Sequence, residues 1–176
     1  MIWNDLRLRT WAAAGGVTPY DARMINPASI DLCWSGQYKV VSRIFDDKRI
    51  GWSSKVDWSA TMTVECLLLE PNKLYLLDSI EYVRIPTNAS GMLALKSSIG
   101  RRGIEHLHAG FFDPGFHGTC TWEIVSMWPV ANMITKGDRL MQMVMSECEV
   151  PDKDYTKTGR YAGQKEPTGN LPERNT

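Results

Sequence analysis

The sequence has few cysteines, and none of them stands at the spacing of a zinc site. Cys33, Cys66, Cys120 and Cys148 are far apart, and no two of them form a C-x-x-C pair. This spacing argues against a cysteine-based zinc centre. It favours free thiols in a reducing compartment.

A net charge and long apolar runs are also missing. Twenty Lys and Arg balance twenty Asp and Glu, so nothing attracts nucleic acid or an anionic membrane over long range. No apolar run is long enough to span a membrane, and residues 1–7 lack the apolar core of a signal peptide. We expect one soluble, cytoplasmic domain, with neither nucleic acid nor a membrane as partner.

Short strands separated by turns are expected over most of the chain. Residues 4–14 favour a short helix, which Asn4 or Asp5 can cap and which Gly15 and Gly16 end. Beyond Pro27 the apolar residues alternate, which is typical of strands. The expected strands span residues 29–34, 37–41, 66–69, 74–77, 81–85, 92–95, 119–127 and 140–146. This pattern predicts a mostly β sandwich or barrel.

From Pro151 to the end the composition is polar. Such a segment is either a disordered tail or a lid that becomes ordered over a ligand. Tyr155 and Tyr161 are aromatic residues of the kind that a lid would pack against the domain, and composition alone leaves both readings open.

A short polar segment, residues 96–103, has the composition of a phosphate site. Lys96, Ser97, Ser98 and Arg101 offer two cations and two hydroxyls, the donors that phosphate oxygens accept. Taken alone, this segment is more often an ordinary solvated loop.

Glu123 lies in an otherwise apolar strand. Alternation places it on one face with Thr121 and Val125. A carboxylate there requires a partner, or its desolvation suits it to general acid–base chemistry. The alternatives are proton transfer and a structural ion pair with Arg101 or Lys96, and neither is favoured at this point.

Asp113 precedes Pro-Gly, which is good turn chemistry, although its carboxylate could also face a sugar hydroxyl or a water. The nearby phenylalanines, Phe111, Phe112 and Phe116, could form a slot for a ring or belong to the core. His106 and His108 would share one strand face, and His117 could join them in a metal site. We do not expect a metal there, because no cysteine or carboxylate lies at a supporting spacing.

Several segments together resemble one known family. They are residues 25–32 (INPASIDL), 69–71 (LEP), 80–86 (IEYVRIP), 96–103 (KSSIGRRG), 109–118 (AGFFDPGFHG), 121–125 (TWEIV) and 161–168 (YAGQKEPT). Their content and order resemble the zinc-independent dCTP deaminases of the trimeric dUTPase-like superfamily, over roughly residues 1–169. The H-x-E and P-C-x-x-C signature of zinc-dependent deaminases is missing.

The resemblance implies a distorted β-barrel or jelly-roll with a short N-terminal helix. Residues 1–150 would form the dUTPase-like β domain, and residues 151–176 a mobile C-terminal tail closing over the active site. The implied assembly is a homotrimer with active sites between subunits. The implied reaction is hydrolysis of dCTP to dUTP and ammonia, with Mg²⁺ brought by the triphosphate and no zinc. Feedback by dTTP is left open by the sequence.

The resemblance also implies a role for each matching residue. Glu123 would be the general acid/base, with Ser97, Arg101 and the Ala109 carbonyl positioning it and the water. The remaining matches would bind the nucleotide: Lys96 and Ser98 the triphosphate, Asp113 the 3′-hydroxyl, the backbone of Thr121 and Trp122 the base, and Tyr155, Arg160 and Gln164 the triphosphate from the tail.

Four residues depart from the family pattern. Lys96 and Arg160 exchange one cation for another, His108 replaces a threonine, and Trp122 replaces a leucine beside the glutamate. The departures keep a dCMP or modified-cytosine substrate open. A bifunctional enzyme that forms dUMP is another alternative, because related hydrolases hold a water-orienting aspartate where Asp113 stands. A non-catalytic nucleotide sensor is a third.

Overall fold

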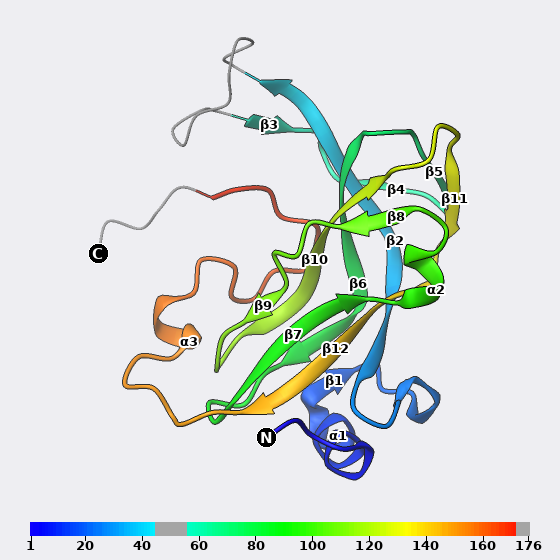
Figure 1. Ribbon diagram of the computed structural model, residues 1–176. Helices are drawn as coiled ribbons and strands as arrows, with labels where there is room; N and C mark the ends of the chain where they lie inside the picture. Colours follow the sequence, from blue (N-terminus) through cyan, green and yellow to red (C-terminus); the bar gives the residue numbers. More distant parts are fainter. Residues whose placement is uncertain (45–55, 172–176) are drawn as a thin grey trace.

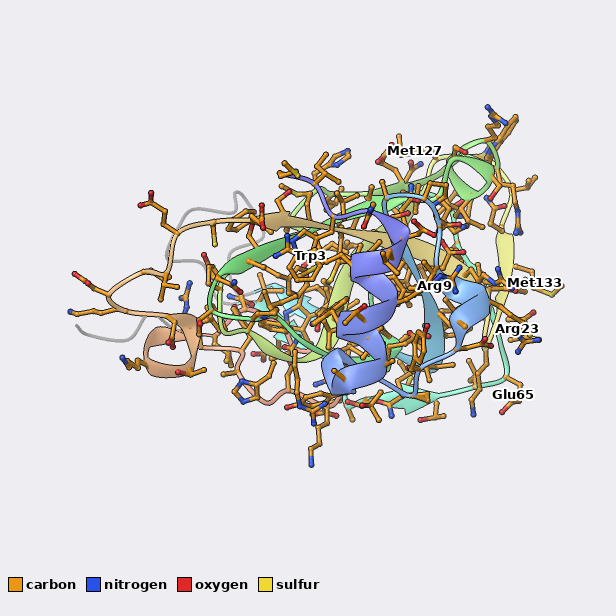
Figure 2. The ribbon with its side chains drawn as sticks, turned by 90° about the horizontal axis from the view of Figure 1, so that it is seen from below. Trp3, Arg9, Arg23, Glu65, Met127 and Met133 are labelled. Carbon is orange, nitrogen blue, oxygen red and sulfur yellow. The ribbon has the colours of Figure 1, made fainter. Side chains whose placement is uncertain are left out.

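The computed structural model describes residues 1–44 and 56–171. Helix α1 (Asp5–Trp11) begins where Asn4 accepts a hydrogen bond from the Arg7 amide at 3.1 Å. The chain continues through a π-helical turn (Ala12–Gly16), within which Gly15 adopts φ +94°. The predicted N-terminal helix is confirmed. Figure 2 looks at the molecule from the α1 side and shows this helix lying across one end of the sheet.

Ten strands of the described chain form one curled antiparallel sheet (Figure 1). Its main path runs in the order β8 (Ile104–His106), β10 (His117–Ser126), β6 (Leu74–Arg84), β2 (Ile30–Ile44), β12 (Arg139–Glu147), β7 (Ala89–Leu95), β9 (Phe111–Phe112). Off this path, β1 (Val17–Thr18) pairs with β6, while β3 (Val56–Trp58) and β4 (Met62–Thr63) pair with β2. A separate pair joins β5 (Cys66–Leu69) and β11 (Asn132–Thr135). The mostly β, barrel-like prediction is confirmed.

Two strands are longer than the sequence pattern suggested. Strand β2 continues through the Ser35-Gly36 break because Gly36 adopts φ +89° and the pairing with β6 shifts register there. Strand β6 likewise joins the expected segments 74–77 and 81–85, since Asp78 and Ser79 are buried within it.

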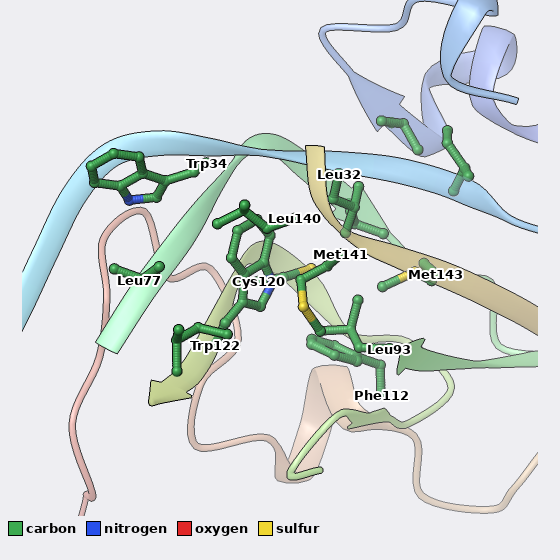
Figure 3. Packing of buried hydrophobic residues seen from close by; sticks show 14 of the residues in the cluster. Leu32, Trp34, Leu77, Leu93, Phe112, Cys120, Trp122, Leu140, Met141 and Met143 are labelled. Carbon is green, nitrogen blue, oxygen red and sulfur yellow. The ribbon is translucent and has the colours of Figure 1, made fainter. Parts of the chain in front are cut away.

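The core fills the inside of the curled sheet. Figure 3 shows Trp34, Leu77, Trp122 and Leu140 among the buried apolar side chains, together with Met143 of β12. Trp122 and Trp34 are among the largest fully buried side chains. The core therefore fixes β2, β6, β10 and β12 relative to one another, and β10 carries the candidate glutamate.

Two local expectations were wrong. Residues 97–100 form one helical turn, α2 (Ser97–Gly100), rather than a loop. His106 and His108 do not share a strand face, because β8 ends at His106 and His108 has a left-handed backbone with φ +59°. His106 is fully buried and His108 is exposed.

The part of the tail that the structure describes, residues 151–171, lies against the domain. It contains the short helix α3 (Tyr155–Thr158) and then runs beside β9 and β10, as the orange and red segment in Figure 1 shows. Residues 172–176 of the predicted tail lie outside the described residues. None of the helices in the described ranges could cross a membrane.

Candidate active site

A cavity of about 540 Å³ opens between the sheet and the tail. Its walls come from β3, β6, β9, β10 and the segment after residue 154. The lining residues are Trp58, Leu74, Leu76, Ala109, Phe111, Phe112, Asp113, Phe116, Thr121, Glu123, Tyr155, Arg160, Tyr161, Gln164, Thr168, Gly169 and Asn170. The cavity is thus largely apolar, with two carboxylates and one cation among these residues.

Glu123 stands on the wall that β10 contributes. Thr121 and Glu123 line the cavity, whereas Trp122 between them is fully buried in the core on the other face. The predicted alternation is therefore confirmed. The side chain of Trp122 lies away from the cavity, so only its backbone could face a ligand there.

The Glu123 carboxylate has no cationic partner from Lys or Arg within the described ranges. Its side chain is 26% exposed, and its Oε2 is buried without a hydrogen bond among these residues. The nearest ionisable group is His106, whose Nε2 lies 3.6 Å from Oε2. The structural ion pair with Arg101 or Lys96, which the sequence left open, does not form within one chain.

Lys96 instead binds a buried aspartate. Its Nζ lies 2.6 Å from both carboxylate oxygens of Asp31, which also accepts from Asn26 Nδ2 at 2.8 Å. Asp31 is 1% exposed. This contact fixes the start of α2, because Lys96 directly precedes the helix.

The α2 segment and the cavity are separate within one chain. Ser97, Ser98 and Arg101 are exposed, and none of them lines the cavity. The structure thus brings together one group of the predicted site residues: Ala109, Asp113, Thr121, Glu123, Tyr155, Arg160 and Gln164. It leaves Lys96, Ser97, Ser98 and Arg101 outside that group.

Tail residues close one side of the cavity through hydrogen bonds to β10. Gln164 accepts from the Thr119 amide at 3.0 Å and donates from Nε2 to the Thr119 carbonyl at 2.6 Å. The Thr168 amide donates to Thr121 Oγ1 at 3.2 Å. The amide of Tyr155 donates to the Pro114 carbonyl at 2.8 Å. The tail is therefore held along the same strand that carries Glu123.

The Asp113 segment forms the turn expected from the sequence and also lies at the cavity. The Phe116 amide donates to the Asp113 carbonyl at 3.1 Å, which closes the Asp-Pro-Gly turn, and Asp113 is exposed at the cavity. Phe112 and Phe116 pack edge to face with centroids 4.6 Å apart. Both are buried core residues that also line the cavity.

Sequence reasoning missed two residues near the site. Trp58 lines the cavity and donates from Nε1 to Asn170 Oδ1 at 3.2 Å, so β3 contacts the tail. No motif surrounds Trp58, and nothing in the sequence indicated this contact. The sequence suggested His106 only as a metal ligand. The available signal for its position was the alternation of polar and apolar residues in its strand, which lies next to β10.

Buried acids lie beside the site in β6. Asp78 pairs in register with Thr121, and its Oδ1 accepts a short hydrogen bond from Ser35. Burial raises the pKa of Asp78 to about 7, against the effect of that hydrogen bond. Burial also raises the pKa of Glu81, which accepts from the Cys33 amide at 2.9 Å.

Comparisons with known proteins agree on one family. A model of the dCTP deaminase-like family matches residues 4–148. A protein of Corynebacterium kroppenstedtii named "dCTP deaminase, dUMP-forming" is 30% identical over 96% of this chain and 95% of its own. A protein of the same name from Rhodococcus jostii is 30% identical over 96% of this chain and 94% of its own.

A solved structure supports the fold. The 2′-deoxycytidine 5′-triphosphate deaminase of Agrobacterium tumefaciens superposes with a TM-score of 0.66 at 21% identity, over 82% of this chain. This chain spans about half of that protein, since the match covers 47% of it. The expected barrel type is therefore confirmed.

Proposed function

Because the chain belongs to the dCTP deaminase-like family, we propose that it hydrolyses dCTP to dUTP and ammonia. The observation that carries the proposal is Glu123. The partly buried carboxylate of Glu123 lies on the wall of a cavity large enough for a nucleotide base and sugar. One of its oxygens has no hydrogen-bond partner among the described residues. Such a group is suited to moving protons at a bound ring.

In the proposed reaction, Glu123 takes a proton from a water molecule as that water attacks C4 of cytosine. The proton passes to N3. Glu123 then takes the proton of the new C4 hydroxyl and gives it to the amine, so that collapse of the tetrahedral intermediate breaks the C4–N bond, releases ammonia and leaves uracil with a C4 carbonyl and the proton on N3. One water is consumed for each ammonia released. The backbone carbonyl of Ala109, at the cavity wall, would hold the water, and the backbone of Thr121 and Trp122 would bind the base edge.

We propose that a homotrimer completes this site. Ser97, Ser98 and Arg101 are exposed on α2, away from the cavity of their own chain. In a trimer, these residues of a neighbouring copy would face Glu123, with Ser97 and Arg101 placing the water and the carboxylate.

Apolar surface next to α2 supports such an interface. Trp128 packs over Gly103, and Arg102 donates to the Met133 carbonyl at 2.7 Å. Yet the side chains of Trp128 and Met133 are 51% and 55% exposed. Large exposed apolar side chains clustered in this way mark protein interfaces.

The triphosphate would lie between α2 and the tail. Ser98 offers a hydroxyl. Lys96 offers the ammonium N–H that is not used in its contacts with Asp31. Tyr155, Arg160 and Gln164 would approach from the tail, and Asp113 would accept from the 3′-hydroxyl. Mg²⁺ would enter with the triphosphate and neutralise part of its charge. dTTP, which carries the same sugar and triphosphate, would compete for these contacts.

A second activity is favoured by one observation. Asp113 lines the same cavity as Glu123 and is exposed, so a second carboxylate could orient a water towards the phosphates. The relatives named above are called dUMP-forming. The candidate is a bifunctional enzyme that also hydrolyses dUTP to dUMP and pyrophosphate.

A substrate panel tests both activities. The purified protein is incubated with dCTP, dCMP, CTP and dUTP in the presence of Mg²⁺, and the products are separated by chromatography. Deamination predicts dUTP and ammonia from dCTP. Pyrophosphate together with dUMP identifies the bifunctional enzyme. Binding of dCTP without any turnover of the four nucleotides would contradict the proposal and favour a sensor.

A further inference from the structure

His106 is a buried histidine with no hydrogen-bond partner for either ring nitrogen among the described residues. It ends β8, pairs in register with Ile124 of β10, and is 0% exposed. A buried polar group without a hydrogen bond loses its contacts with water and gains nothing in return, which lowers the stability of the fold. A ring kept there at that cost, one strand away from a candidate catalytic carboxylate, suggests a role in the site.

The ring faces the one Glu123 oxygen that is also unsatisfied. His106 Nε2 lies 3.6 Å from Glu123 Oε2, and both atoms are buried. A hydrogen bond of this kind is about 2.9 Å long, so a shift of under ~1 Å joins them. Catalytic hydrogen bonds are often long before substrate binds.

The ring of His106 packs closely against Gly110. A Cβ atom at Gly110 would lie 3.2 Å from the ring Cε1, so the ring fits against bare backbone on that side. The same Cβ would lie 2.8 Å from the Leu93 side chain. Glycine at position 110 therefore leaves the space that the ring edge of His106 occupies.

Two other titratable residues near His106, His108 and Glu105, belong to its own segment. The ring of His108 lies edge-on with its centroid 5.9 Å away, and its Nε2 is 3.4 Å from Glu105 at the surface. The Glu105 carboxylate accepts from the His106 backbone amide at 3.0 Å. Within the described ranges, the carboxylate that the His106 ring contacts is thus that of Glu123.

We propose that His106 is a positioning residue for Glu123, an inference that rests on the proposed function. Its Nε2–H donates to Oε2 and fixes the carboxylate, so that the other oxygen is presented to the cavity. A carboxylate held in this way keeps its orientation through both proton transfers.

A matched pair of variants tests this role in turnover. His106→Gln keeps an N–H donor near the position of Nε2, whereas His106→Met has a similar shape without a donor. We expect His106→Met to lower kcat by about 100-fold, the lower end of what a positioned acid–base group contributes, with little change in KM. His106→Gln should recover most of this loss. Equal kcat in the two variants, with both folded, would overturn the proposal.

The second measurement does not depend on turnover. Nitrogen-15 spectra of the histidine side chains report which ring nitrogen carries the proton. We expect the Nε2–H form at His106 in the full chain, with a resonance that shifts in Glu123→Leu and not in the surface control Glu70→Gln. A proton on Nδ1, or no response to Glu123→Leu, would contradict the pairing. A wild type that shows the pairing and turns over no cytosine nucleotide would refute the proposed function alone.

Discussion

Asp78 provides a stability test with a predicted sign. This carboxyl is 1% exposed in β6, and burial raises its pKa from 3.8 to about 7. Between roughly pH 4 and 7 the folded protein holds a proton that the unfolded chain has released. The free energy of unfolding therefore falls as the pH rises through this window. A difference of about three pH units corresponds to about 4 kcal/mol at most.

Asp78→Asn imitates the protonated acid and removes this loss. We expect the variant to match the wild type within about 0.5 kcal/mol at pH 4, and to exceed it by about 2–4 kcal/mol at pH 8.5. Urea unfolding, followed by tryptophan fluorescence at one protein concentration, measures both values. Asp152→Asn, at an exposed position, is the control. A variant that is no more stable than the wild type at pH 8.5 would refute the reasoning.

Two further predictions concern the α2 anchor and the tail. Lys96→Met leaves the buried carboxylate of Asp31 without its closest cation, so the free energy of unfolding should fall by about 3 kcal/mol, measured by urea unfolding. Gly169→Ala places a Cβ 2.2 Å from the Trp58 ring, so the tail should loosen and KM for dCTP should rise several-fold in steady-state assays. Lys165→Ala, at an exposed tail position, should leave KM unchanged.

Each of these two predictions has a result that would contradict it. An unchanged free energy of unfolding in Lys96→Met would mean that Asp31 is satisfied by Asn26 and by Arg139, whose Nη1 lies 3.7 Å from it. Equal KM values in Gly169→Ala and the wild type would mean that contact between β3 and the tail plays no part in binding.

The sequence predicted those features that depend on local pattern. Alternation placed Thr121 and Glu123 on one face and Trp122 on the other, because side chains in a strand alternate regardless of the rest of the chain. The capping residues and glycines of the first helix were equally local. The order of short motifs indicated the family before any geometry was known.

The remaining features depend on contacts between distant residues. Lys96 meets Asp31 across 65 positions, and only the pairing of β2, β12 and β7 brings them together. His106 and His108 looked alike in the pattern, yet a left-handed residue after β8 separates a buried ring from an exposed one. The separation of α2 from the cavity is also tertiary, and it is the reason that we propose a neighbouring copy.

The most direct test of the account is ammonia release from dCTP by Glu123→Gln beside the wild type. We expect the wild type to release one ammonia for each dUTP or dUMP formed. The variant should fold, bind dCTP with similar affinity and release essentially none, since the amide cannot accept and return the proton. Glu70→Gln should behave as the wild type. Undiminished ammonia release by Glu123→Gln would contradict the central role of Glu123.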